Sequence, residues 1–421
     1  MLFILCYFPS FSIDADLGCD SILLKRDSLF SSPFKTQPEG KGKRHEVLRS
    51  TYTENKIAGK KKLTNNSDLK YKAFRPGELW LDDKGQHINA HGGGMLFHEG
   101  KYYWFGEHKS VNTSCALVGV RCYSSTDLYN WKNEDVALSV EKNDTLSPIT
   151  AGCTIERPKV IFNKKTKKFI MYFHLELKGQ GYGAAQVGIA TSDQVTGPYK
   201  FVKSLRLNAG IWPVNMNQDQ RTSKLAVDDF KEWWTPEWRR AIEDGLFVRR
   251  DFEGGQMSRD MTLFVDEDDK AYHIYSSEEN LTIHIAELTD DYLNYTGKYV
   301  RLFPGGHNEA PALFKKEGKY YLITSGCTGW APNAARSAVA SSIWGPWESI
   351  GNPCRGEGAE FTFESQSTYV LPVSGEKSTF IFMADRWTPQ CHVDGRYVWL
   401  PIKFENSKPL IEWKKEWKLR D

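Results

Sequence analysis

One short strand pattern returns five times along this chain, and it constrains the fold more than any other feature. Each copy is a turn with Gly or Lys, followed by a strand of alternating aromatic and aliphatic residues. The copies lie at residues 100–107, 167–174, 270–277, 318–325 and 378–385. Most copies follow a shorter strand and precede a third one, which is typical of hairpin-built sheets. Three or four strands per unit, repeated five times, predict an all-β, five-bladed β-propeller, with an irregular β-sandwich as the alternative.

The longest interval between copies separates the second from the third and indicates an insertion. Within residues 207–256, the side chains of Phe230, Trp233, Trp234 and Trp238 recur at helical spacing. We therefore expect a partly helical insertion between blades 2 and 3. Loops on a rigid scaffold commonly shape binding sites, although a plain packing insertion explains this pattern equally well.

The pattern also divides the chain. Residues 1–85 begin with the short apolar run MLFILCYFPSFS and continue as a polar stretch, so we expect a possible signal-peptide remnant followed by a linker. Residues 86–405 are expected to form the propeller, and residues 406–421 a C-terminal tail packing on it. The apolar start predicts a secreted, periplasmic or cell-surface protein, and no run is long enough to span a membrane.

Composition narrows the choice of partners. The 55 basic and 53 acidic residues leave a net charge of +2 with no basic stripe, so we expect no nucleic-acid partner. The 14 Trp suit both a β-rich core and the binding of sugar rings. Eight Cys show no zinc spacing. Cys115 with Cys122, and Cys327 with Cys354, are possible disulfide pairs that spacing alone does not decide.

Eight short motifs follow one another in an order that resembles glycoside hydrolase family 43, most closely its exo-β-1,3-galactosidase (galactan 1,3-β-galactosidase) branch. They are 90–94 (AHGGG), 104–107 (WFGE), 156–160 (ERPKV), 258–260 (SRD), 309–311 (EAP), 329–333 (GWAPN), 365–366 (SQ) and 385–387 (DRW). The resemblance covers residues 86–405 and implies a propeller with its active-site pocket on the axis. It also implies release of terminal β-1,3-linked galactose from galactan or arabinogalactan-type polysaccharide by inversion. An α-L-arabinofuranosidase or β-xylosidase is the alternative enzyme, and a non-catalytic carbohydrate-binding propeller is the second alternative.

Glycoside hydrolysis needs an acid for the leaving oxygen and a group that positions water on the opposite face of the sugar. The resemblance implies that Glu309, ahead of Ala310-Pro311, is the acid, with a pKa raised in a partly dry pocket. It assigns to Asp260 the task of keeping that acid protonated and oriented. The family's usual base, an Asp in the first blade, is absent here. Gln366 occupies the place from which the galactosidase branch holds the water.

The remaining candidates are expected to bind the sugar. Glu107 and Glu156 are assigned to sugar hydroxyls first and to base work second, and Arg157 to a pocket carboxylate or a hydroxyl. Trp330 and Trp387 are expected to be stacking platforms, with Arg386 beside them. The residues His91, His174, His307 and His392 show no metal-ligand spacing. We therefore expect no metal in the chemistry and no cofactor, while a structural calcium ion on the axis stays open because some family members hold one.

Overall fold

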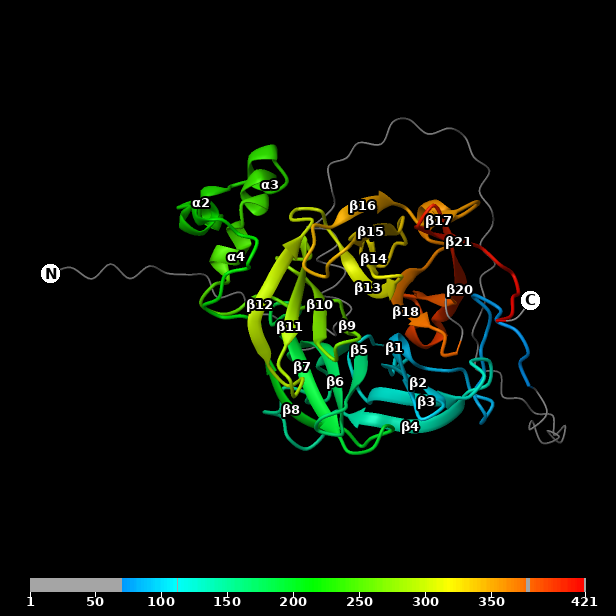
Figure 1. Cartoon of the computed structure of the whole chain (residues 1–421). Coiled ribbons are helices and arrows are strands. Elements are labelled where there is room, and N and C mark those ends of the chain that lie inside the picture. The colour runs from blue at the N-terminus through cyan, green and yellow to red at the C-terminus, as the bar shows by residue number, and fades with distance from the viewer. Residues whose placement is uncertain (1–69, 112, 376–378, 420–421) are drawn as a thin grey trace.

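The computed structural model describes residues 70–111, 113–375 and 379–419, and these form five sheets arranged around one axis (Figure 1). Blade 1 contains β1 (His91–His98), β2 (Lys101–Glu107), β3 (Gly119–Ser125) and β4 (Lys132–Ser139). Blade 2 contains β5 (Thr154–Asn163), β6 (Lys168–Glu176), β7 (Gln186–Ser192) and β8 (Lys200–Leu205). Blade 3 contains β9 (Met261–Val265), β10 (Ala271–Ser277), β11 (Thr282–Leu288) and β12 (Tyr295–Leu302). The expected all-β, five-bladed propeller is confirmed.

Blades 4 and 5 complete the ring. Blade 4 contains β13 (Glu309–Lys316), β14 (Lys319–Ser325), β15 (Arg336–Ala340) and β16 (Glu348–Gly351). Blade 5 contains β18 (Gln366–Pro372), β19 (Phe380–Arg386), β20 (Arg396–Glu405), β21 (Lys408–Glu412) and the short β17 (Cys354–Arg355), which pairs in parallel with β21. The 3₁₀ turns η3 (Ala359–Phe361) and η4 (His392–Asp394) lie in its loops. In every blade the first long strand is innermost, so β1, β5, β9, β13 and β18 surround the axis (Figure 1).

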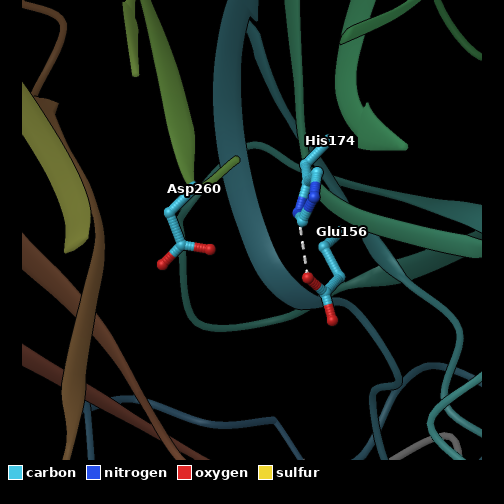
Figure 2. Close-up of side chains that lie close together, drawn as sticks. All are labelled: Glu156, His174 and Asp260. Atoms are coloured by element: carbon cyan, nitrogen blue, oxygen red, sulfur yellow. Dashed lines mark hydrogen bonds and ion pairs between the residues drawn. The ribbon is translucent and has the colours of Figure 1, made fainter. Parts of the chain in front are cut away.

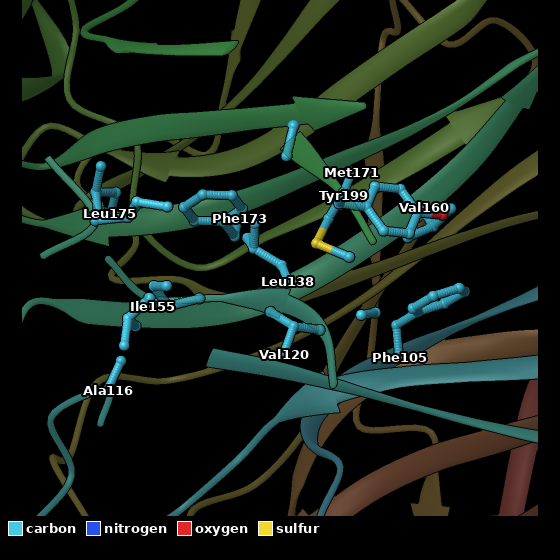
Figure 3. Packing of buried hydrophobic residues seen from close by; sticks show 14 of the residues in the cluster. Phe105, Ala116, Val120, Leu138, Ile155, Val160, Met171, Phe173, Leu175 and Tyr199 are labelled. Atoms are coloured by element: carbon cyan, nitrogen blue, oxygen red, sulfur yellow. The ribbon is translucent and has the colours of Figure 1, made fainter. Parts of the chain in front are cut away.

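The alternation seen in the sequence explains how the blades pack. Successive side chains of a strand point to opposite faces, so each blade presents an apolar face to both of its neighbours. Figure 3 shows the result between blades 1 and 2, where Phe105 and Leu138 meet Val160, Met171 and Phe173, all buried. Burying such side chains contributes on the order of 1.5–3 kcal/mol each before the entropy of ordering the chain is subtracted.

Four of the inner strands begin with a β-bulge. The pairing register shifts between His91 and Gly94 in β1, between Glu156 and Lys159 in β5, between Glu309 and Ala312 in β13, and between Ser367 and Tyr369 in β18. Bulges kink a strand and re-aim its side chains. The bulges of β5 and β13 begin at Glu156 and Glu309, and that of β18 follows Gln366, so they set the direction of these candidate site residues.

The insertion carries the helices α2 (Gln218–Thr222), α3 (Pro236–Glu243) and α4 (Leu246–Arg250), with the 3₁₀ turn η2 (Val227–Asp229) before α3. Thr235 caps α3 by accepting a hydrogen bond from the Trp238 amide, and Pro236 opens the helix, where a missing N–H costs nothing. The insertion projects beside blade 3 (Figure 1), and Arg301 of β12 holds it by donating to the Ile242 and Glu243 carbonyls. The expected partly helical insertion is therefore present.

The two ends of the propeller differ from the expected boundaries. Residues 70–85, assigned to the linker, pack on the ring: the Phe74 and Trp417 backbones hydrogen-bond to each other, and the Gly77 amide donates to the Tyr397 carbonyl. Residues 408–412, assigned to the tail, form β21 of blade 5. Phe74 completes the apolar cluster between blades 1 and 5, and Ile411 of β21 packs in the cluster between blades 4 and 5, so both segments belong to the fold. Residues 1–69 lie outside the described part of the chain.

The thiols of Cys122, Cys327 and Cys354 are free, so neither of the two possible disulfide pairs forms. Among the described residues, no helix has the length and apolar character needed to cross a membrane.

Candidate active site

A cavity of about 200 Å³ lies on the propeller axis, where the bulged starts of the inner strands meet. Eight of the nine residues predicted for the site line it, namely Glu107, Glu156, Arg157, Asp260, Glu309, Trp330, Gln366 and Trp387. They come from all five blades or from the loops beside them. The propeller thus brings together residues that span about 280 positions of the sequence.

Arg157 occupies the centre of this arrangement. Its guanidinium donates to Gln366 Oε1 at 2.5 Å and to the Ser367 carbonyl at 3.0 Å, and its Nη2 lies 2.9 Å from Asp260 Oδ2. The backbone amide of Arg157 donates to Glu107 Oε1 at 3.0 Å. The side chain is buried, and its φ of 54° belongs to the bulge of β5. Arg157 therefore links blades 2, 3 and 5 through its guanidinium and blade 1 through its backbone amide.

The two carboxylates predicted for catalysis are coupled through the backbone. Asp260 Oδ2 accepts a hydrogen bond from the Ala310 amide at 3.1 Å, directly after Glu309. Glu309 Oε1 accepts one from Asn280 Nδ2 at 2.6 Å. Burial and the nearby Glu309 carboxylate raise the pKa of the Cys327 thiol well above its usual range, so Cys327 stays protonated beside Glu309. Asp260 thus fixes the strand that carries Glu309, and Asn280 fixes one oxygen of its carboxyl group.

The orientation of the Gln366 amide is determined by its partners. Guanidinium and indole groups can only donate, so the amide oxygen faces Arg157 and Trp387, whose Nε1 lies 3.3 Å away. The amide nitrogen donates to Ser325 Oγ at 2.9 Å. Both acceptor positions of Oε1 are therefore occupied, and the group left for a water molecule is the second hydrogen of Nε2.

A buried hydrogen-bond network of Glu156, His174 and Glu176 lies on the blade 2 side of the cavity. His174 donates from Nδ1 to Glu156 at 3.0 Å (Figure 2) and from Nε2 to Glu176 at 2.9 Å. Burial disfavours the imidazolium, but the two carboxylates outweigh it and raise the pKa of His174 to about 9. Burial would likewise raise the pKa of Glu156, yet His174, Lys109 and the Tyr182 hydroxyl hold it at about 2. Glu156 is therefore a stable anion suited to accepting hydrogen bonds from hydroxyls.

Glu107 lies in a different environment. Its Oε2 is 2.5 Å from Lys109 Nζ, and both side chains are buried. Burial and the neighbouring Glu156 raise the pKa of Glu107, while Lys109 opposes them. A Cβ added at Gly92, whose φ is 58°, would lie 2.2 Å from Glu107 Oε1. The glycine stretch of blade 1 therefore leaves the space that this carboxylate fills.

Glu156, His174 and Asp260 offer ligand atoms within 4.8 Å of one another, which is the spacing of a metal site (Figure 2). Their chemistry fits an ion poorly. The imidazole nitrogens of His174 are both engaged with carboxylates, and Asp260 already faces the Arg157 guanidinium. Metal ligation would need a neutral imidazole with a free lone pair.

Aromatic rings form the outer wall. Trp330 and Trp387 lie edge to face with centroids 5.8 Å apart, and Arg157 lies 5.6 Å from the Trp387 ring centre. Trp233, Trp234 and Trp238 of the insertion also line the cavity, and Trp234 packs edge-on against His307 at 4.7 Å. The insertion thus helps to close the site.

Arg386 is the predicted residue that does not line this cavity. Its Nη2 donates to the Phe363 carbonyl at 2.7 Å, and its guanidinium lies 5.6 Å from the Trp413 ring centre. The reason is the alternation of β19 (Phe380–Arg386): Asp385 accepts a hydrogen bond from the Gly92 amide, so its neighbour Arg386 points to the other side.

Several lining residues were not predicted as site residues, including Lys109, His174, Tyr182, Asn280 and the three tryptophans of the insertion. His174 could have been found, because it stands opposite Glu156 in the β5–β6 pairing and shares a face with Glu176, two residues on. The tryptophans of the insertion carry no such signal, since their helical spacing indicates packing equally well.

Comparisons with known proteins agree with this geometry. The family model described as Glycosyl hydrolases family 43 matches residues 210–357. The solved GH43 β-1,3-galactosidase BT3683 with galactodeoxynojirimycin is 58% identical, with a TM-score of 0.80 and coverage of 82% of this chain and 100% of that one. An exo-β-1,3-galactanase from Phanerochaete chrysosporium, solved with β-1,3-galactotriose, is 32% identical, with a TM-score of 0.66 and coverage of 83% and 68%.

A curated relative, β-D-galactofuranosidase xynD of Aspergillus niger, is 26% identical over 129 residues, which are 28% of this chain and 37% of that protein. The match therefore spans little more than a third of the curated relative. This chain is therefore a glycoside hydrolase: acidic groups gather in the axial cavity of its propeller, and it is similar to solved glycosidases. It belongs to glycoside hydrolase family 43.

Proposed function

We propose that this protein is an exo-acting β-1,3-galactosidase that removes terminal galactose from galactan or arabinogalactan-type polysaccharide, with inversion at the anomeric carbon. One observation carries the proposal: Glu309, Asp260 and Gln366 line one axial cavity, joined by Arg157 and by the Ala310 amide. The 58% identity to a β-1,3-galactosidase over the whole of that chain supports the choice of sugar and linkage.

Glu309 is assigned the role of general acid. Asn280 donates to one oxygen of its carboxyl group and so orients the acid that gives its proton to the glycosidic oxygen. Asp260 acts through position and charge. It anchors the amide that follows Glu309, and its negative charge disfavours ionisation of the acid.

Gln366 is assigned to the nucleophilic water. The Arg157 and Trp387 bonds occupy its oxygen, so the amide orients water through Nε2 and cannot by itself accept the proton that the water loses. Of the two other carboxylates predicted for the site, Glu107 is the better proton acceptor, because its pKa is raised while that of Glu156 is held at about 2. Glu156 and Trp387 then bind the sugar.

The shape of the cavity favours action at a chain end. Its volume of about 200 Å³ is smaller than the 300–1,000 Å³ typical of sites for drug-sized ligands. The tryptophans of the insertion close one side. A single terminal sugar fits this description better than the interior of a polymer. A polymeric substrate also agrees with a secreted, periplasmic or cell-surface enzyme. The side chains of Glu156, His174 and Asp260 fit a metal ion poorly, which agrees with metal-free chemistry.

The α-L-arabinofuranosidase or β-xylosidase alternative is weaker, because the position of the usual blade 1 Asp is taken by the Gly92 backbone and by the carboxylate of Glu107. The decisive experiment offers the enzyme β-1,3-galactan, arabinan and xylan, and follows the first product by proton NMR. We expect galactose from galactan alone, released first as the α-anomer. Arabinose or xylose would support the alternative, initial β-galactose would contradict inversion, and binding without turnover would indicate a carbohydrate-binding propeller.

A further inference from the structure

A second cavity, of about 580 Å³, opens in blade 5, around η3 and the end of β21. It is more open to solvent than the axial cavity and contains none of the residues assigned to catalysis. Its walls include Phe361, Phe363, Glu364, Arg386 and Trp413. The hydrolysis proposed for the axial cavity does not involve this second cavity.

Two large aromatic side chains are exposed inside it. Phe361 is 49% exposed and Trp413 is 38% exposed. A single exposed apolar residue is ordinary, but aromatic groups gathered in one concave site commonly mark a binding surface. The C–H faces of sugar rings pack on such rings and bury apolar area.

Neighbouring groups hold Trp413 in place before any ligand arrives. The Phe363 ring packs against it with centroids 5.8 Å apart, and the Arg386 guanidinium lies 5.6 Å from its centre. A preorganised ring loses little conformational entropy on binding, which favours affinity.

The charges around the cavity balance. Three basic residues, Arg355, Arg386 and Lys414, stand among three acidic ones, Glu357, Glu364 and Glu412. Such a rim offers donors and acceptors without a net field, so it suits a neutral ligand rich in hydroxyl groups better than an anion or a cation.

Residues that line the second cavity are near neighbours in the sequence of residues that line the axial cavity. Trp387 and Gln366 line the axial cavity, while Arg386 and Glu364, one and two residues earlier, line the second. Between them, Thr362, Phe363 and Glu364 form a left-handed turn with φ of 51°, 57° and 60°, which Arg386 holds through the Phe363 carbonyl. The same two segments therefore contribute to both cavities.

We propose that the blade 5 cavity is a second, non-catalytic binding site for a segment of neutral β-galactan, and that it retains the polymer near the axial cavity between cleavage events. This inference rests on the proposed function for the identity of the sugar. Its ligand is the polymeric form of the substrate, because a disaccharide held in the axial cavity does not need a second contact.

The first test compares polymer with dimer in the double variant Phe361→Ala/Trp413→Ala. We expect kcat/KM on β-1,3-galactan to fall at least about 5-fold, a loss of roughly 1 kcal/mol, with kcat/KM on β-1,3-galactobiose unchanged. Glu364→Ala, on a side chain that is 71% exposed, is a milder second variant in case the double variant folds poorly. Phe97→Ala is the matched control, because Phe97 is 42% exposed on a strand of blade 1. Equal losses on dimer and polymer, or no loss on polymer, would overturn the proposal.

The second test measures binding without turnover. In a Glu309→Gln background, retardation in gels containing β-1,3-galactan should persist when excess galactose fills the axial cavity, and should disappear with the double variant. Equal retardation by xylan would overturn the assignment to galactan. If the parent enzyme fails to cleave galactobiose but still shows Phe361/Trp413-dependent retardation, the proposed function fails while the second site stands.

Discussion

Arg157 shows how much of the site depends on single residues. It is a buried cation whose partners lie in three other blades, and its loss would leave Asp260 and Gln366 without the group that orients them. Removing one partner of a buried ion pair is costly, because the other charge stays buried without compensation. The roles of Glu309 and Asp260 and the protonation of His174 likewise depend on charged neighbours, and each of the three residues can be tested separately.

Glu309→Gln should reduce kcat on β-1,3-galactobiose by roughly 10²–10⁴-fold, because the amide keeps the shape of the side chain but has no proton to give. Circular dichroism and thermal unfolding should match the parent. An aryl galactoside with a good leaving group should lose much less activity, since its departure needs little protonation. Near-parental turnover of the disaccharide would remove Glu309 from the role of acid.

Asp260→Asn should move the alkaline limb of the pH–rate profile to lower pH, by about one unit or more. Its negative charge disfavours ionisation of Glu309, and its removal also leaves the Arg157 cation unbalanced, so both effects lower the pKa of the acid. Kinetics on galactobiose between pH 4 and 9 measure the shift.

The matched control for this variant is Asp266→Asn. Asp266 follows β9 in blade 3, and its ion pair with Lys315 of blade 4 lies away from the cavity. A profile that stays in place while only stability falls would make Asp260 a structural turn residue.

His174 should make stability depend on pH. Its pKa is about 9 in the folded protein against an ordinary value of 6.5, so its stabilising contribution is complete below pH 6.5 and is lost as the pH rises through 9. The unfolding free energy should fall across this window with a slope of up to about 1.4 kcal/mol per pH unit from this group. Urea unfolding should show that His174→Gln flattens this slope while His98→Gln does not. An unaltered slope in His174→Gln would mean that the imidazole is not charged between Glu156 and Glu176.

At the level of whole elements, the bulges and the insertion give the site its shape. The bulges at the starts of β5 and β13 turn Glu156 and Glu309 toward the axis, although a regular strand would continue its strict alternation. The insertion adds a wall of tryptophans on the side of blade 3. We propose that this wall binds the substrate, so we expect its effect to appear in KM.

Trp234→Ala should raise KM for galactobiose about 10-fold, equivalent to ~1.4 kcal/mol, with a smaller change in kcat. Trp234 lines the cavity and packs on His307, which has no assigned catalytic role. Trp212→Ala is the matched control, because Trp212 stacks on Phe252 at 4.0 Å in the same insertion but does not line the cavity. Equal effects of the two variants would reduce the insertion to a packing element.

For the whole molecule, the important feature is how the ring closes. Blade 1 meets blade 5 without a shared sheet, and residues 70–85 and 413–419 cover the seam. Phe74 and Trp417 are buried there with stacked rings 4.4 Å apart, and the Trp417 indole donates to the Trp399 carbonyl. Stability of the propeller therefore depends on segments outside the five strand repeats.

Trp417→Ala should lower the free energy of unfolding by about 3–5 kcal/mol, the usual cost of removing a buried tryptophan. Urea unfolding followed by tryptophan fluorescence measures it. Trp413→Ala, four residues earlier and exposed, should cost only about 0.5 kcal/mol. Similar losses in the two variants would show that the seam contributes little and that blade packing alone holds the ring.

The sequence determined the number of blades, the position of the insertion and eight of the nine residues placed at the axis. These features are local: alternation with a period of two, turns rich in Gly and Lys, and short motifs that each carry their own signal. The family resemblance then assigned roles to these side chains. Local sequence patterns do not give the distances between them.

Only the tertiary structure decided the rest. It turned Arg386 away from the axis and placed it in a second cavity, because neighbouring residues of a strand face opposite sides. It made His174 a cation by bringing Glu156 and Glu176 to both of its nitrogens, and it gave the space above Gly92 to Glu107. The charge of a buried group depends on neighbours from other strands and blades, and the sequence does not state which strands will lie side by side.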